Sequence, residues 1–363
     1  MKEDKDSAAS PALSAPQVLE ELARRAESAG ASDVHLQMTG KSAAISFRLD
    51  GVMAPATTLG EDIAERVFGR IKYLARLKTY QESLPQDGRI DRGDLHTRHD
   101  VRVATYPTVT GEKIVLRFFT ESSALALNEL GLSSAVCAEL EPRLRRPSGL
   151  VLLTGPAGSG KTTTIHACLS FVAALGGRHI ITVEDPVERV LSGIMQTEVC
   201  EERGLTFAKA ARHLLRQDPQ VLAIGEIRDE ETANIVVRAA LTGHLVISTL
   251  HAGSCQGVLE RLLLMCPDRF AAASAVELIL NQRLLRRLCA KCGGTGCAAC
   301  FQTGYLGRVP VVEWFRMDDA ARQQLREQGA AAIKPTQPLE TAALELVKAG
   351  VTNQAELERT FGR

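Results

Sequence analysis

The stretch that decides the fold is Gly155-Pro156-Ala157-Gly158-Ser159-Gly160-Lys161-Thr162. It satisfies the pattern G-x-x-x-x-G-K-[ST], which is typical of a phosphate-binding loop. The apolar run at residues 150–153 predicts a buried parallel strand before the loop, and residues 163–175 predict a helix after it. Glycines let successive backbone N–H groups converge on phosphate oxygens at a helix N-terminus. The stretch therefore predicts a nucleoside triphosphate site, and a glycine-rich turn that binds nothing is the alternative.

Residue types within this loop indicate separate roles. The Lys161 ammonium would reach the β and γ phosphates, and the Thr162 hydroxyl would hold Mg²⁺. We expect ATP to be bound by the loop and the residue after it, namely Gly155, Pro156, Ala157, Gly158, Ser159, Gly160, Lys161, Thr162 and Thr163. The loop itself leaves open what the nucleotide energy drives.

The composition is that of a globular protein with two domains. The chain has 363 residues, of which 45% are hydrophobic and 24% are charged. Because 43 basic residues balance 43 acidic ones and only 4% are aromatic, we expect no nucleic-acid partner. No apolar run approaches the ~20 residues of a membrane span, and residues 1–10 lack the pattern of a signal peptide. These observations predict a cytoplasmic protein without a membrane span.

The first 120 residues predict a tail and a small α+β domain. Residues 1–14 are polar, small and proline-containing, which is typical of a disordered tail. Helical spacing predicts helices at residues 16–29 and 63–77. Alternating polar and apolar residues predict antiparallel strands at residues 34–36, 44–49, 101–104 and 113–118. Helices and an antiparallel sheet together indicate an α+β domain over residues 15–120.

From residue 131 the pattern changes to apolar strands that alternate with helices. We expect strands at residues 150–153, 179–183, 221–224 and 245–250, with helices that include residues 207–216 and 230–241. This alternation predicts an α/β domain with a parallel sheet over residues 131–363. Residues 121–130 are the expected linker between the two domains.

Two acidic residues end predicted strands of this sheet. Glu226 follows Val221-Leu222-Ala223-Ile224-Gly225, and Glu184 follows Ile180-Ile181-Thr182-Val183. Because ligands of parallel sheets lie at the carboxyl ends of the strands, we expect both carboxylates beside the phosphate loop. One can act as a base or position water, and the other can support the metal. Either carboxylate alone could be a helix cap, but two in one such domain favour function.

Two histidines flank the next predicted strand. His251 follows the strand at its carboxyl end, where an imidazole could contact or sense the γ-phosphate. His244 precedes the strand at the opposite end. An isolated histidine is more often structural than catalytic, so His244 is the weaker candidate.

Four of the nine cysteines are clustered in residues 287–310. Cys289, Cys292, Cys297 and Cys300 form two closely spaced C-x-x-C pairs, which can supply four thiolates to one structural Zn²⁺. A redox-active or unliganded thiol cluster is the alternative, although redox motifs need only one such pair. The other five cysteines are most simply small core residues.

Several segments together resemble the ATPases of type II secretion and type IV pilus assembly. Residues 184–188, 225–229 and 242–252 are similar to the aspartate box, Walker B motif and histidine box of that family. The first domain matches too, in Ser32-Asp33-Val34-His35, Arg48-Leu49-Asp50-Gly51, Gln86-Asp87-Gly88-Arg89, residues 100–103 and residues 111–117. The resemblance covers residues 16–315. It implies a RecA-like P-loop NTPase domain preceded by a PAS-like domain, in a homo-hexameric ring.

The resemblance also implies roles for single residues. Glu226 would lie near Mg²⁺ and Glu184 would be the general base. Arg102 and Arg117 match a pair of arginines that reach the nucleotide from the first domain, which suits the guanidinium fork. The alternative is that both arginines lie on the solvent face of a strand pair and have no role toward the nucleotide. With Lys161, His251 and His244, these residues form the candidate catalytic set.

As a member of this family, the chain would be an ATP-hydrolysing motor that acts on inner-membrane platform proteins from the cytoplasm. It departs from the full-length pattern because it starts almost directly at the second N-terminal domain and has only residues 293–296 between its cysteine pairs. Retraction ATPases of the superfamily lack the four cysteines and end with an Ala-Ile-Arg-Ala-Gly-Glu segment, which is not found here. A retraction ATPase, a RecA-like nucleic-acid motor and a non-hydrolysing scaffold are the alternatives.

Overall fold

The computed structural model describes residues 14–118 and 125–362, which form two units. One unit contains residues up to 121 together with residues 289–306, and the other contains residues 122–288 and 307–363. The division at residue 121 falls in the expected linker. The predicted tail lies almost wholly in residues 1–13, and part of the linker in residues 119–124, outside the described residues. The cysteine element, which we assigned to the ATPase domain, is grouped with the first unit instead.

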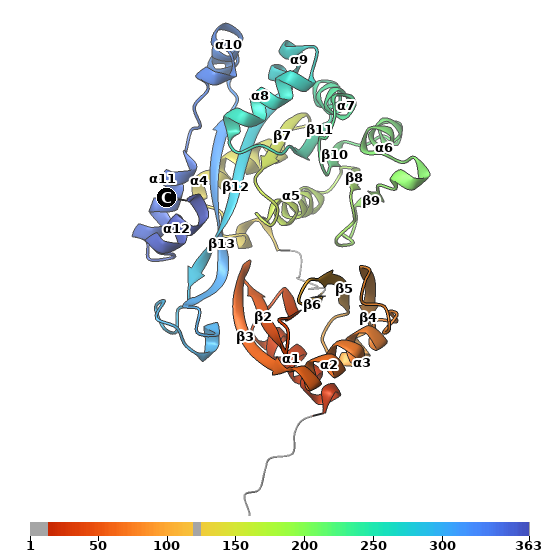
Figure 1. Ribbon diagram of the computed structural model, residues 1–363. Helices are drawn as coiled ribbons and strands as arrows, with labels where there is room; N and C mark the ends of the chain where they lie inside the picture. Colours follow the sequence, from red (N-terminus) through yellow and green to blue (C-terminus); the bar gives the residue numbers. More distant parts are fainter. Residues whose placement is uncertain (1–13, 119–124, 363) are drawn as a thin grey trace, which may run out of the picture. The chain divides into compact units, whose positions relative to one another are not determined.

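Within residues 14–118, six strands form one antiparallel sheet in the order β3-β2-β1-β6-β5-β4. The strands are β1 (Asp33–Met38), β2 (Ser42–Leu49), β3 (Val52–Gly60), β4 (Gln86–Ile90), β5 (Val101–Thr108) and β6 (Gly111–Phe118). The helices are α1 (Ala15–Ser28), α2 (Glu61–Leu74) and the short α3 (Arg92–Leu95) (Figure 1). This is the expected α+β domain.

Alternation along the strands produces the core of this unit. Leu36 in β1, Ile45 and Phe47 in β2, and Ile114 and Leu116 in β6 are all buried against the apolar sides of α1 and α2. The sequence did not predict β3, because β3 has no fully buried residue and contains a proline next to a register shift. Such an edge strand carries no clear apolar period.

In the described part of the second unit, seven strands form a sheet in the order β13-β12-β7-β11-β10-β8-β9, and its pairs from β12 to β9 are parallel. The strands are β7 (Gly149–Thr154), β8 (Ile180–Glu184), β9 (Met195–Glu198), β10 (Val221–Ile224), β11 (Leu245–Thr249), β12 (Val276–Leu288) and β13 (Tyr305–Arg316). The helices are α4 (Ser134–Leu144), α5 (Lys161–Leu175), α6 (Phe207–Leu214), α7 (Glu230–Leu241), α8 (Cys255–Met265), α9 (Arg269–Ala275), α10 (Asp319–Gln328), α11 (Leu339–Lys348) and α12 (Gln354–Phe361).

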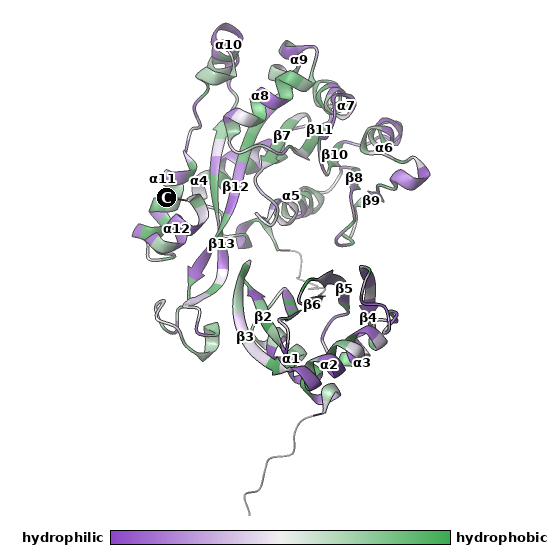
Figure 2. Cartoon of the chain, viewed as in Figure 1, coloured by the Kyte–Doolittle hydropathy of each residue, from purple (hydrophilic) through white to green (hydrophobic). Residues whose placement is uncertain are grey.

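Both faces of this sheet are buried. In β7, Leu150 and Leu152 pack into a core with α6 to α9, whereas Val151 and Leu153 pack into a second core with α4 and α5. Strands covered on both sides read as continuous apolar runs, and Figure 2 shows β7 and β11 in hydrophobic colours. Helices on both faces of a parallel sheet confirm the expected α/β fold.

The two longest strands, β12 and β13, were not predicted. In β12, Asn281, Gln282 and Arg283 interrupt the apolar run, although Asn281 and Gln282 are buried. Because these side chains are polar, the sequence pattern did not indicate a strand here, although β12 lies inside the sheet between β13 and β7. β12 pairs in parallel with β7, which places its polar residues next to the phosphate-binding loop.

Candidate nucleotide-binding site

The loop between β7 and α5 has the backbone that its glycines predicted. Gly158 and Gly160 have φ angles of 74° and 84°, in the left-handed region that side chains disfavour. Helix α5 begins at Lys161, directly after Gly160. The N-terminus of α5, with its unpaired backbone N–H groups and partial positive charge, therefore lies at the loop, which suits a phosphate group.

Gln282 of β12 braces this loop, a role that the sequence did not reveal. Its buried amide donates to the Ser159 carbonyl at 2.7 Å and accepts from the Thr164 hydroxyl at 2.9 Å. A side chain at Gly155 would collide with the Gln282 backbone carbonyl and would lie 2.7 Å from the Ser159 hydroxyl. The glycine and the glutamine thus fix the loop against the sheet.

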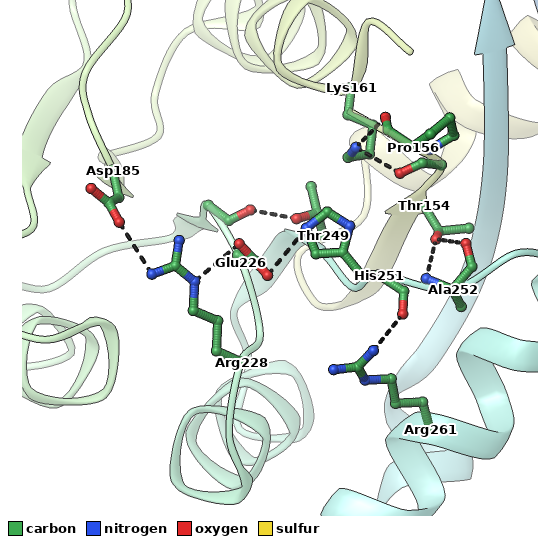
Figure 3. A network of polar contacts seen from close by, with 12 residues as sticks. Thr154, Pro156, Lys161, Asp185, Glu226, Arg228, Thr249, His251, Ala252 and Arg261 are labelled. Carbon is green, nitrogen blue, oxygen red and sulfur yellow. Dashed lines mark hydrogen bonds and ion pairs between the residues drawn. The ribbon is translucent and has the colours of Figure 1, made fainter. Parts of the chain in front are cut away.

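Lys161 is folded over the same loop. Its ammonium donates to the carbonyls of Gly155 at 2.8 Å and Pro156 at 3.0 Å (Figure 3). Burial lowers the pKa of Lys161, and the negative charge of Glu226 acts in the opposite direction. The ammonium is therefore held at the loop by two carbonyls, and a phosphate bound at the loop would replace these carbonyls as its partner.

A cavity of about 180 Å³ opens beside Lys161 and joins the predicted strand-end residues. Its lining includes Lys161, Thr162, His166, Glu184, Asp185, Glu188, Glu226, Arg228 and His251. Both predicted carboxylates and the predicted histidine His251 are therefore brought together with the loop lysine. Glu226 and His251 come from the residues after β10 and β11, and Glu184 ends β8.

The carboxylate of Glu226 is the centre of a polar network shown in Figure 3. The His251 ring Nε2 lies 3.2 Å from Glu226 Oε1, and Arg228 Nε donates to Glu226 Oε2 at 3.1 Å. Arg228 also pairs with Asp185 at 3.2 Å. Position 225 requires glycine, because a Cβ atom there would lie too close to the Val183 carbonyl and the Phe207 ring. The carboxylate of Glu226 thus lines the same cavity as the Thr162 hydroxyl.

Glu184 is held differently and more tightly. Its buried carboxylate accepts from the Thr182 hydroxyl at 2.6 Å and the Gln196 amide at 2.8 Å, both at Oε1. The His166 ring Nε2 lies 3.0 Å from Oε2. Burial alone would raise the pKa of Glu184, but the hydrogen bonds from His166, Thr182 and Gln196 bring it below the ordinary value. Glu184 is thus an oriented carboxylate at the cavity wall.

Not every predicted residue lies at the cavity. His244 precedes β11, at the strand's other end, and its ring Nδ1 contacts the Ala239 carbonyl at 3.0 Å. Thr163 is exposed on the first turn of α5 and does not line the cavity. The structure does not bring His244 to this site, so its catalytic role stays a prediction.

Arg102 and Arg117 belong to the first unit and are direct neighbours across β5 and β6. Arg117 Nε donates to the buried carboxylate of Asp33 at 2.7 Å, and Arg48 Nε approaches the same carboxylate at 3.2 Å. Burial would raise the pKa of Asp33, but bonds from Arg117 and Ser32 and the nearby positive charges lower it. The Arg117 side chain remains 63% exposed, so its guanidinium is oriented by Asp33 and still open to a ligand.

The four clustered cysteines have a geometry that fits a metal. Among the described residues, the Sγ atoms of Cys289, Cys292, Cys297 and Cys300 lie within 4.8 Å of one another, and three of their separations are 3.7, 3.8 and 3.9 Å. A tetrahedral Zn²⁺ with ~2.3 Å bonds to sulfur requires separations of about 3.8 Å. Burial would raise the pKa of Cys292, but hydrogen bonds from the backbone N–H groups of Gly294 and Gly296 lower this pKa to about 6. The donor set therefore suits zinc.

Comparison with known proteins identifies the family. A family model described as "Type II/IV secretion system protein" matches residues 9–359. The chain belongs to this family. The "Type II secretion system protein HxcR" of Pseudomonas aeruginosa is 42% identical over 83% of this chain and 68% of that protein. A "Putative type II secretion system protein E" of Escherichia coli is 42% identical over 82% of this chain and 65% of that protein. The chain thus spans about two thirds of the length of these relatives.

Solved structures agree with the fold of this secretion-family chain. The pilus retraction motor PilT with bound ADP is 27% identical, with a TM-score of 0.63 over 95% of this chain and 96% of that one. The Legionella pneumophila ATPase DotB has a TM-score of 0.73 at 20% identity over 98% of each chain. The expected RecA-like domain with an N-terminal α+β domain is confirmed. No helix in the described residues has the length and apolar character to cross a membrane.

Proposed function

We propose that this chain hydrolyses ATP as the motor of a secretion or pilus machine. The observation that carries the proposal is one cavity that joins Lys161, Glu184, Glu226 and His251 at the phosphate-binding loop. A binding protein needs the loop, but it does not need two oriented carboxylates beside it. The membership in the secretion family supports the same activity.

The chain's own residues account for the steps of hydrolysis. Lys161 would leave the carbonyls of Gly155 and Pro156 and bind the β and γ phosphates. The Thr162 hydroxyl and Glu226 would hold Mg²⁺, which neutralises charge on the phosphates. Glu184 would accept the proton of the attacking water. His251, in contact with Glu226, would report the presence of the γ-phosphate.

The assembly is part of the proposal. We propose a homo-hexamer in the cytoplasm, attached to the inner membrane through platform proteins, in which Arg102 and Arg117 reach nucleotide from the first unit. The exposed guanidinium of Arg117, held by Asp33, supports a role toward phosphate. Movement of the first unit would then be coupled to hydrolysis.

We also propose that the cysteine element binds one structural Zn²⁺, which would fix the turn between β12 and β13. Metal analysis of the purified chain is expected to give about one zinc per chain. A content near zero, together with an unchanged melting temperature for Cys289→Ser, would remove the zinc proposal.

A genetic complementation experiment tests the motor function. Deletion of the gene is expected to abolish surface pili or secretion of the exported protein, and the native gene is expected to restore it. Lys161→Ala is expected to be present at normal level and to restore nothing. Restoration by Lys161→Ala would contradict the proposed motor.

Retraction is the second candidate, and the similarity to PilT favours it. The four cysteines favour assembly instead, because the resemblance assigns that element to the assembly members. The same deletion strain separates the two functions. Loss of pili indicates an assembly motor, whereas an excess of unretracted pili indicates a retraction motor.

A further inference from the structure

We infer that His166 is a positioning residue for ATP hydrolysis, which holds the Glu184 carboxylate against the phosphate-loop helix so that one oxygen site stays open to water. This inference rests on the proposed function, and it adds a residue to the site that neither the motifs nor the comparisons name. The two side chains are in contact at 3.0 Å and both are buried.

His166 lies on α5, the helix that follows the phosphate-binding loop. Thr162 and His166 are four residues apart, so they lie on the same side of that helix, and both line the cavity. The His166 side chain is only 9% exposed. A polar ring buried at this depth needs a hydrogen-bond partner, and Glu184 at the end of β8 supplies it at 3.0 Å.

The neighbouring donors fill only part of the acceptor sites of Glu184. A carboxylate has about four lone-pair sites. Thr182 and Gln196 occupy the sites on Oε1, and His166 occupies one on Oε2. Because an ionised carboxylate only accepts, His166 Nε2 must carry the proton in this contact. Among the described residues no other group donates to Oε2, so one of its sites remains for the attacking water, and the bond from His166 fixes the position of that site.

The contact between His166 and Glu184 joins two elements of the site. Helix α5 carries Lys161 and Thr162 at its start, and β8 carries Glu184 at its end. His166 ties the phosphate-binding helix to the proposed base directly, not through the backbone. Other charged groups that line the cavity are Lys161, Asp185, Glu188, Glu226, Arg228 and His251, and within the described part of the chain none of them forms a hydrogen bond or ion pair with the His166 ring.

The test compares His166→Leu with His166→Gln, because a glutamine amide can place a donor near the position of Nε2 and leucine cannot. His166→Leu is expected to lower kcat about tenfold to a hundredfold and to change KM for ATP by less than about threefold. His166→Gln is expected to retain most of the kcat. His213→Leu, an exposed histidine on α6, is the matched control and is expected to behave as the native chain.

Two readouts separate positioning from a structural role. Loss of the His166 bond raises the pKa of Glu184, so the acid limb of kcat should move to higher pH in His166→Leu. In a Glu184→Gln background, His166→Leu should have no further effect, because it acts through that carboxylate. An equal fall in kcat in both backgrounds, or a native kcat in His166→Leu, would overturn the inference. A native kcat in Glu184→Gln would instead show that Glu184 is not the base, and both claims would fall.

Discussion

At the scale of single residues, the glycines of the phosphate loop are not equivalent. Gly155 and Gly158 both have positive φ angles, but only Gly155 faces other atoms. A methyl group at Gly158 meets nothing within 4 Å, whereas one at Gly155 meets the Gln282 carbonyl and the Ser159 hydroxyl. The loop therefore needs glycine at 158 for conformation and at 155 for space as well.

This difference predicts unequal costs of substitution. Gly158→Ala should lower the free energy of unfolding by about 1 kcal/mol, the cost of a left-handed residue. Gly155→Ala should cost at least about 3 kcal/mol, since strain and overpacking add, and should also weaken ATP binding. Chemical denaturation and nucleotide titration of the two variants measure this. Equal denaturation midpoints would show that Gln282 does not brace the loop.

The sequence predicted those site residues whose signal is local. Lys161, Glu226 and His251 stand at fixed places relative to glycines and strand ends, and the structure brings them to one cavity. Gln282 and His166 carry no such signal, because each acts on a residue more than fifteen positions away in the chain. Only the pairing of β12 with β7, and the packing of α5 beside β8, makes their roles visible.

At the scale of elements, the C-terminal helix α12 is attached to β12 by a buried carboxylate. Glu356 is fully buried and accepts from the backbone N–H and side chain of Arg286 and from the side chain of Arg359. Burial would raise the pKa of Glu356, but these bonds lower it from 4.5 to about 2. Because the folded pKa lies below the unfolded one, the stabilisation is complete above pH 4.5 and is lost as the pH falls toward 2.

We therefore predict a pH-dependent effect of Glu356→Gln. At pH 7 the variant should expose α12, since removing one partner of a buried pair costs about 3–5 kcal/mol. Hydrogen exchange of the amides in residues 354–361 measures this, and the difference from the native chain should shrink between pH 4.5 and pH 2. A difference that is the same at both pH values would contradict the assigned pairing. Glu358→Gln, on the same helix, is the control.

Prediction of elements was good for interior strands and poor at edges. β10 and α7 match their expected ranges, because uniform apolar runs and a glycine stop give unambiguous signals. β3, β4 and β9 lie at edges of their sheets, where half-exposed residues blur the period. β12 was missed for a different reason, namely the polar residues that it carries to the loop.

At the scale of the whole molecule, the proposed motor requires that the first unit takes part in hydrolysis. Arg117 is the residue that tests this, because its guanidinium is held by Asp33 and remains exposed. Arg117→Lys keeps a positive charge for Asp33 but loses the planar fork that suits phosphate oxygens. We predict that this variant folds normally and has a kcat at least about tenfold lower.

The control for this prediction is Arg24→Lys, at an exposed ion pair of α1 in the same unit. It should keep the native kcat. If Arg117→Lys and Arg24→Lys hydrolyse ATP equally fast, Arg117 has no role in hydrolysis. The proposed coupling between the units would then receive no support from Arg117.

The central claim is that the cavity beside Lys161 hydrolyses ATP, and Mg²⁺-dependent phosphate release by the purified chain tests it most directly. The native chain is expected to turn over ATP, and Lys161→Ala, which keeps the loop glycines, is expected to lose at least about 99% of the rate. Full activity in Lys161→Ala would contradict the account.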